Sequence, residues 1–177
     1  IWNPFSWFRP EPWNWNTTWE NPPHQSSYCN EHISAKDALQ RLQETGGLAH
    51  ATVDGDLVLE DLSFRGFFIN YVWVRGDLVL EQLSFSDHCI LANVVVDSRL
   101  TMKRLSLDRI LEVREVRVSR DLGLQNLVFP WSQGDETRLP LRLHCKNNLV
   151  RGQLVMPNLK LPDVAMDLSG TTCGTLD

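Results

Sequence analysis

Two pairs of carboxylates are the residues of this chain whose types and spacing could do chemistry. Asp56 and Asp77 are 21 residues apart, and Glu60 and Glu81 have the same separation. If the fold stacks residues at this spacing, each pair forms a small acidic site, and carboxylate oxygens are ligands that calcium prefers. Some polysaccharide-cleaving enzymes hold calcium in this way. No Arg or Lys is obviously placed beside either pair as a catalytic base, so we expect a solvated acidic face and no catalytic or metal-binding residue.

The histidines and cysteines do not add a second reactive group. The five histidines have no metal-ligand spacing, and the neighbouring side chains of His88 and Cys89 diverge instead of sharing a cleft. The chain has no Cys-x-x-Cys pair for zinc or redox chemistry. We therefore predict a protein without a cofactor and without enzymatic activity. An even number of cysteines fits an oxidising compartment, with buried free thiols as the alternative; they are Cys29, Cys89, Cys145 and Cys173.

The acidic pairs belong to a ten-residue motif that the chain repeats five times. The copies at residues 55–64 and 76–85 both read Gly-Asp-Leu-Val-Leu-Glu, then Asp or Gln, and then Leu-Ser-Phe. More divergent copies follow at 98–107, 120–129 and 152–161, so successive copies begin 21, 22, 22 and 32 residues apart. A period of this length predicts a solenoid, in which each unit buries its apolar face only by stacking on its neighbours.

Apolar alternation within each copy predicts two short strands joined at a corner. In the second copy, Leu78 and Leu80 are followed by the polar pair 81–82, and then by Leu83 and Phe85. Residues that alternate in this way place one face of a strand in the core. The polar pair is where the chain turns toward the next face.

A third strand precedes each copy. Val72 and Val74 recur as Val94 and Val96, 22 residues later. Three strands per period predict an all-β solenoid: a short triangular parallel β-helix of about five 21–22-residue coils, spaced about 4.8 Å apart. A leucine-rich repeat is the main rival, but its helical half would have to be the β-branched and aromatic segment 68–74.

The tripeptides Gly55-Asp56-Leu57 and Gly76-Asp77-Leu78, with the alternation that follows them, resemble the bactofilin type of right-handed parallel β-helix. The resemblance extends over residues 48–168, although the bactofilin coil is shorter and richer in glycine. It implies a right-handed β-helix, and it implies self-assembly into polymers if the ends of the solenoid are open.

Both ends of the solenoid are expected to be closed. Ser34 and Asp37 resemble a capping box at the start of a helix that would cover the first coil. Pro157 and Pro162 lie in the last coil, where proline cannot donate a hydrogen bond to a further strand. The expected order is a Trp- and Pro-rich arm at 1–33, a capping helix at 34–46, the β-helix at 47–168 with an insertion around 130–145, and a loose tail at 169–177.

Two aromatic residues and the insertion are the best candidates for a binding surface. Tyr71 and Trp73 alternate with valines that we expect to be buried, so they are predicted to point outward. Exposed aromatic side chains on one face require a cover. The Trp-rich arm is the nearest supplier, and a glycan is the alternative. The insertion contributes the loop residues Trp131, Asp135 and Glu136.

Cys89 and Cys145 are the pair that we expect to form a disulfide. Cys89 is near a corner of the second coil and Cys145 lies in the insertion, so they begin two rungs apart, or about 10 Å. The slack of the insertion could bring their Cα atoms to the roughly 5.5–6 Å that a disulfide requires. Cys29 and Cys173 lie toward opposite ends, and their state is left open.

The arm predicts a location outside the cytoplasm. The chain begins at Ile1, which suggests that a signal peptide or a membrane anchor lies upstream. Trp2, Trp7 and Trp13 resemble the aromatic belt at a membrane interface. We therefore expect a periplasmic or secreted protein that is tethered by a segment upstream of Ile1.

The overall pattern favours an interaction domain. A net charge of −5 argues against nonspecific binding to nucleic acid. A rigid solenoid without a convergent polar site is expected to be a non-enzymatic scaffold of a cell-envelope assembly, presenting its faces to a protein partner. The alternatives are a carbohydrate-binding or polysaccharide-cleaving β-helix and a self-assembling bactofilin-like scaffold.

Overall fold

The computed structural model describes residues 31–129, 142–157 and 165–176. Several expectations lie outside the described residues: those for the arm at 1–30 with Trp2, Trp7 and Trp13, for the loop residues Trp131, Asp135 and Glu136, and for Pro162.

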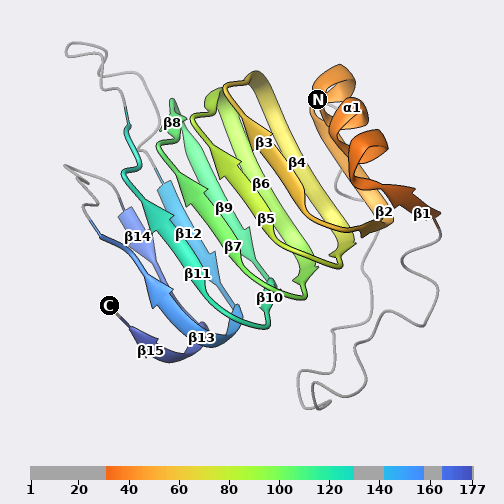
Figure 1. Cartoon of the computed structure of the whole chain (residues 1–177). Coiled ribbons are helices and arrows are strands. Elements are labelled where there is room, and N and C mark those ends of the chain that lie inside the picture. Colours follow the sequence, from red (N-terminus) through yellow and green to blue (C-terminus); the bar gives the residue numbers. More distant parts are fainter. Residues whose placement is uncertain (1–30, 130–141, 158–164, 177) are drawn as a thin grey trace, which may run out of the picture.

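The described chain is a parallel β-solenoid of about six turns with one helix near its N-terminal end (Figure 1). The predicted fold is therefore confirmed. The first face contains β3 (Leu57–Glu60), β5 (Leu78–Glu81), β7 (Leu100–Lys103) and β11 (Leu122–Gln125). The second face contains β8 (Ser106–Leu107), β9 (Ile110–Arg114), β12 (Arg142–Lys146) and β14 (Ala165–Asp167). The third face contains β1 (Glu31–Ser34) and β10 (Arg117–Val118). Strand β15 (Thr172–Leu176) begins on the third face and reaches the first face, where Leu176 pairs with Leu154.

Long strands connect the faces. The second face continues into the third through β2 (Gly47–Asp54), β4 (Ser63–Val74) and β6 (Ser84–Val96), and the third continues into the first through β13 (Leu149–Val155).

The strand register follows the repeat of the sequence. The first leucine of each motif copy stacks on its counterpart in the next coil, which gives the column Leu57, Leu78, Leu100, Leu122 and Leu154. The valines of the third face stack in the same way, in the column Val53, Val74, Val96, Val118 and Val150. The alignment deduced from the sequence is therefore the one that the backbone adopts.

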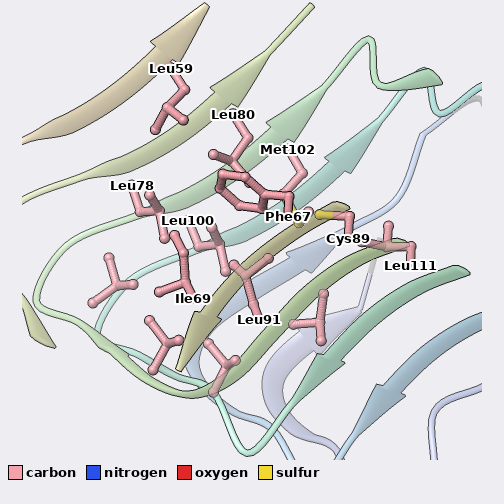
Figure 2. Packing of buried hydrophobic residues seen from close by; sticks show 14 of the residues in the cluster. Leu59, Phe67, Ile69, Leu78, Leu80, Cys89, Leu91, Leu100, Met102 and Leu111 are labelled. Carbon is pink, nitrogen blue, oxygen red and sulfur yellow. The ribbon is translucent and has the colours of Figure 1, made fainter. Parts of the chain in front are cut away.

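The inward side chains form one continuous core along the axis (Figure 2). Leu80 is fully buried and lies between Leu59 in the preceding coil and Met102 in the next. Phe67 and Phe85 widen the core at the second face, where their rings approach to 5.5 Å between centroids. Each coil therefore depends on both of its neighbours for burial.

Two corners of each coil are made by residues with left-handed backbone. The corner between the first and second faces has φ between 51° and 55° at Asp61, Gln82, Arg104 and Asn126. The corner between the second and third faces has φ between 53° and 55° at His50, Tyr71, Asn93, Glu115 and Asn147. The polar pair 81–82 was predicted to turn the chain, and its second residue, Gln82, is the left-handed residue at the corner between the first and second faces.

Helix α1 (Ala35–Thr45) closes the N-terminal end. Ser34 Oγ accepts a hydrogen bond from the Asp37 amide at 3.1 Å, and Gly46 ends the helix with φ 72°. Ala38 and Leu42 are fully buried against the first coil. The capping helix is thus as predicted, except that the three residues before Ser34, which were assigned to the arm, belong to β1 on the third face.

The C-terminal end differs from the prediction. Residues 172–176, expected to be a loose tail, form β15 and pair in parallel with β13. A further rung therefore lies over β13 as far as Leu154, whereas no described strand pairs with Pro157, so the role of that proline stays a prediction. The edge rung of the described structure consists of β14 and β15.

Candidate functional site

The aspartates of the motif bind the backbone of the next coil. Asp56 Oδ1 accepts a hydrogen bond from the Asp77 amide at 2.8 Å, and Asp77 Oδ1 accepts one from the Arg99 amide at 2.9 Å. Asp121 Oδ1 does the same for the Gln153 amide at 3.0 Å. The hydroxyl of Ser98 and then the Arg99 amide hold the pKa of Asp77 below its usual value of 3.8, against the opposing effect of burial.

Glycine precedes two of these three amides, those of Asp77 and Gln153, and the same contact explains it. A Cβ on Gly76 would lie 2.2 Å from Asp56 Oδ1, and a Cβ on Gly152 would lie 2.4 Å from Asp121 Oδ1. The Gly-Asp pair is therefore a structural device, in which glycine lets the carboxylate of the previous coil reach the backbone. Among the described residues, no group of three or more His, Cys, Asp or Glu side chains is arranged to hold a metal ion.

Glu81 is the centre of a charge cluster on the first face. It faces Glu60 on one side and Lys103 on the other. Lys103 Nζ lies 3.3 Å from Glu81 Oε1, and Arg104 Nη2 binds the same oxygen. The cations compensate the repulsion between the stacked glutamates, so this column contributes to the stacking of coils.

Tyr71 and Trp73 lie together on the outer side of the third face, but Tyr71 is not exposed. Its accessibility is 7%, and it forms a cluster with Val95 and Trp73 that is separate from the core. The expectation that Tyr71 is exposed is therefore wrong, because the left-handed corner turns its ring onto the neighbouring coils. The His50 ring stacks on Tyr71 with centroids 5.1 Å apart.

Polar groups hold the Trp73 ring in place. Its Nε1 donates a hydrogen bond to Asp97 Oδ1 at 2.9 Å, and the Arg75 guanidinium lies 4.9 Å from the ring centroid. Arg75 also lies 3.4 Å from Asp54. The half-buried indole is therefore a fixed part of this face, with a cation lying over its ring.

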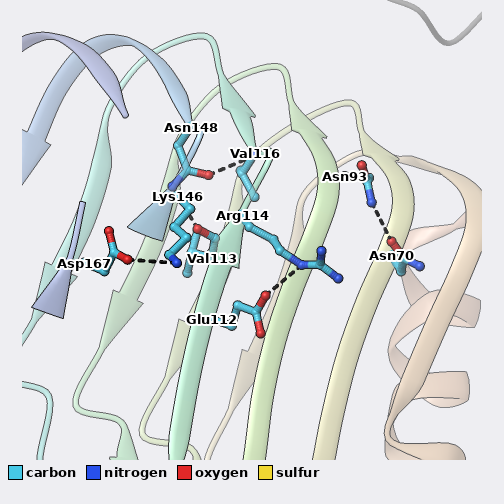
Figure 3. A network of polar contacts seen from close by, with 9 residues as sticks. All are labelled: Asn70, Asn93, Glu112, Val113, Arg114, Val116, Lys146, Asn148 and Asp167. Carbon is cyan, nitrogen blue, oxygen red and sulfur yellow. Dashed lines mark hydrogen bonds and ion pairs between the residues drawn. The ribbon is translucent and has the colours of Figure 1, made fainter. Parts of the chain in front are cut away.

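A buried amide fastens the last coils at the corner between the second and third faces (Figure 3). Asn148 occupies a position that holds valine in earlier coils, and its Nδ2 donates to the Val113 carbonyl at 2.8 Å. Its Oδ1 accepts a hydrogen bond from the Val116 amide at 3.0 Å. On the second face, Lys146 Nζ lies 2.8 Å from Asp167 Oδ2. Lys146 and then the Ser169 amide hold the pKa of Asp167 well below its usual range.

The predicted disulfide between Cys89 and Cys145 is not formed. Both thiols are free and buried. Strand β9 lies between them: Cys89 stacks on Leu111, whereas Cys145 stacks on Val113, two residues farther along the strand. Burial raises the pKa of both thiols, that of Cys145 to about 12. These two cysteines are core residues, and they do not support an oxidising compartment.

An apolar patch on the outer side of the second face was not anticipated. Phe68 is 43% exposed and stacks beside Ile90 of the next coil. His88 and Ile110 occupy the neighbouring column, and they and Ile90 are half-buried. We call these four residues the Phe68 patch. The spacing of 22 residues between Phe68 and Ile90, and between His88 and Ile110, could have indicated this patch in the sequence. It is hard to recognise there because the residues between them are also largely apolar.

Glycines allow the rings of the Phe68 patch to lie against the sheet. A Cβ on Gly47 would be 2.3 Å from Phe68 Cε1, and a Cβ on Gly66 would be 2.7 Å from His88 Cε1. Charged pairs border the patch: Asp87 with Arg109 at 2.9 Å, and Glu112 with Arg114 at 2.7 Å. The result is a flat apolar surface with a charged rim, which is the composition of a protein-binding site.

Comparisons with protein-family models, curated proteins and solved structures give no match to this chain. Within the described ranges, no helix combines the length and the apolar character needed to cross a membrane.

Proposed function

We propose that this domain is a non-enzymatic interaction scaffold that binds a protein partner through the Phe68 patch. The observation that carries the proposal is the exposed Phe68 ring stacked beside Ile90, with Ile110 one coil farther on in the neighbouring column. Exposed large apolar side chains that adjoin one another and are rimmed by charges are typical of interaction sites. Because three strands hold these residues, their spacing is fixed before binding, which lowers the entropic cost of association.

A photo-crosslinking experiment tests this proposal. A photoreactive phenylalanine analogue at position 68 is compared with the same analogue at Val58, which is 39% exposed in the same coil but lies on the first face. We expect a specific crosslinked protein from position 68 in the cells that express the chain naturally, and none from position 58.

Substitutions in the next coil supply the second half of the test. Ile90→Asp should abolish the crosslink from position 68, since Ile90 is its stacked neighbour. Val79→Asp, at the equivalent place beside Val58, should leave it unchanged. Crosslinks of equal yield from both positions, or a crosslink insensitive to Ile90→Asp, would contradict the proposal.

The carbohydrate alternative has weaker support. Asp56 and Asp77 accept hydrogen bonds from the backbone, and the Arg75 guanidinium lies over the Trp73 ring on which a sugar would stack. A Trp73→Ala variant tested on a polysaccharide array would reveal such binding as a loss of signal. The location in the cell envelope and the tether upstream of Ile1 stay predictions.

A further inference from the structure

We infer that the N-terminal arm, residues 1–30, lies across the outer side of the third face and shields it from solvent. This surface is distinct from the Phe68 patch, which lies on the second face. The strand register stacks the outward side chains of the third face in one column along the axis, which consists of His32, Thr52, Trp73, Val95, Arg117 and Leu149.

Several side chains of this column are shielded from solvent although they point away from the core. Thr52 is 2% exposed, Val95 is 4% exposed and Arg117 is 3% exposed. Outward side chains on the other two faces are far more accessible, with Val58 at 39% on the first face and Phe68 at 43% on the second. The third face therefore differs from the others in having a cover over its outward side chains.

Arg117 shows most clearly that this cover is a further segment of protein. Its stacked neighbours, Val95 and Leu149, have shorter side chains and cannot enclose a guanidinium by themselves. Burial lowers the pKa of Arg117, as expected for a cation removed from water. Among the described elements, α1 alone lies outside the stacked strands, and it covers the first coil at one end of the axis (Figure 1). The cover therefore comes from a segment outside the described ranges.

The arm is the segment best placed to supply this cover. It leads directly into Glu31, the first residue of β1, and β1 belongs to the third face. Segments 130–141 and 158–164 instead lead into β12 and β14 on the second face. Thr52 and Arg117 are three rungs apart, or about 14 Å, which about five extended residues can span. The arm is therefore attached at the right face and is long enough to cross it.

The composition of the arm suits the surface that it covers. Residues 1–30 contain five tryptophans and five prolines. Tryptophan rings stack on guanidinium groups, and the third face offers Arg117 beside the apolar Val95. A proline-rich segment favours an extended conformation without internal hydrogen bonds, which suits the outer side of a sheet whose backbone groups are paired along the axis. Glu11 and Glu20 supply negative charge for a buried guanidinium.

Photo-crosslinking within the full chain tests the inference. A photoreactive phenylalanine analogue replaces Trp13 in one variant and Trp19 in another, and mass spectrometry identifies the crosslinked peptides of the monomeric product. We expect crosslinks to peptides of the third face that contain Val95 or Arg117, and none to the first-face strands β5 and β7.

The other outcomes separate this inference from the proposed function. Crosslinks spread over all three faces, or no intramolecular crosslink, would overturn the inference and leave the proposal for the Phe68 patch intact. Crosslinks confined to the Phe68 patch would overturn both, because the arm would then occupy the surface that is proposed for a protein partner.

A pair of arginine substitutions gives a second measure. Arg117→Ala removes the charged group beneath the arm, whereas Arg99→Ala removes an exposed arginine of the first face and is the matched control. Chymotrypsin cleavage within residues 1–30 should become at least about tenfold faster in Arg117→Ala and stay unchanged in Arg99→Ala. Unfolding midpoints separate release of the arm from a general loss of stability. Equal cleavage rates in the parent chain and a folded Arg117→Ala variant would overturn the inference, and the crosslinks decide it if this variant does not fold.

Discussion

Asp56 Oδ1 lies 2.8 Å from the backbone nitrogen of Asp77, the residue at the same position one coil later. In return, the Leu57 amide donates to the Asp77 carbonyl at 2.9 Å. Neighbouring coils are thus joined at this position by two hydrogen bonds, one to the aspartate side chain and one between backbone groups. The repeated Gly-Asp-Leu sequence therefore stabilises the stacking of coils, and the first three predictions test this role.

Removal of one aspartate should weaken the stack. Asp77→Ala leaves the Arg99 amide without its acceptor, and we expect a loss of about 1 kcal/mol in the free energy of unfolding. Asp77→Asn keeps an oxygen at the same place and should lose less. Urea unfolding measures both variants. Equal losses would show that the hydrogen bond to Arg99 is unimportant.

The contribution of Asp77 should depend on pH. Its pKa is lower in the folded protein than the usual 3.8, so the ionised form stabilises the fold. This stabilisation is present above the unfolded-state pKa and is lost as the pH falls through the folded-state pKa. The difference in unfolding free energy between the parent chain and Asp77→Asn should therefore be constant near neutral pH and shrink below about 3.8. A difference that grows on acidification would contradict the assignment.

Alanine at position 76 should be destabilising because of its contact with Asp56. Gly76→Ala places a Cβ 2.2 Å from Asp56 Oδ1, and the displaced carboxylate should cost about 1–2 kcal/mol of stability. Gly123→Ala is the matched control, because its nearest neighbour would be 3.5 Å away. In a double-mutant cycle with Asp56→Ala, the two losses should be less than additive. Strict additivity would mean that the two residues act independently.

The core prediction concerns Leu80, which is fully buried between Leu59 and Met102. Leu80→Ala should destabilise the protein by roughly 2–5 kcal/mol, because it opens a cavity that both neighbouring coils line. Val79→Ala, on the outward side of the same strand, should cost less than about 1 kcal/mol. Thermal unfolding monitored by circular dichroism compares the two, and similar losses would refute the register.

The thiols should differ in reactivity. Cys89 and Cys145 are buried, and burial raises the pKa of both, so alkylation of the native protein should spare them. Cys173 is half-buried and should react before these two cysteines. Mass spectrometry of alkylated peptides provides the measurement. A peptide pair linked through Cys89 and Cys145 would restore the disulfide that the register excludes.

Repetition made the fold predictable, and the departures from repetition were the parts that were missed. Five copies of one motif determined the register of Leu57, Leu78 and Leu100, because stacking equivalent residues is the arrangement that buries all of them. The burial of Tyr71 could not be read in the same way. Its corner holds Asn93 and Asn147 in later coils, and asparagine is enriched in the left-handed backbone region, but tyrosine itself gives no such signal.

Strand β15 and the Phe68 patch were missed in the sequence for different reasons. Strand β15 contains only the Gly-x-Leu start of a further motif copy, at residues 174–176, which is too short to stand out in the sequence although it pairs in register with Gln153 and Leu154. The Phe68 patch follows the rule of alternation, but alternation says which way Phe68 points and not whether another segment covers it. The disulfide prediction treated the insertion as slack, whereas Cys145 is a regular strand residue of β12.

The two columns of left-handed corners limit how a chain of this kind can change in length. From His50 to Asn126, such residues recur every 10 or 11 positions, alternating between the two corners. Deleting the residues from one turning residue to the next would still leave a left-handed residue at the junction. However, that residue would belong to the other corner, so every later strand would lie on the wrong face. Loss of two intervals, as in removal of residues 83–104, deletes one coil and leaves each remaining strand above its proper neighbour. Apart from insertions that leave the later strands in register, such as the one before β12, lineages of this protein should therefore differ by whole coils, so the number of rungs can vary while the faces that they present are preserved.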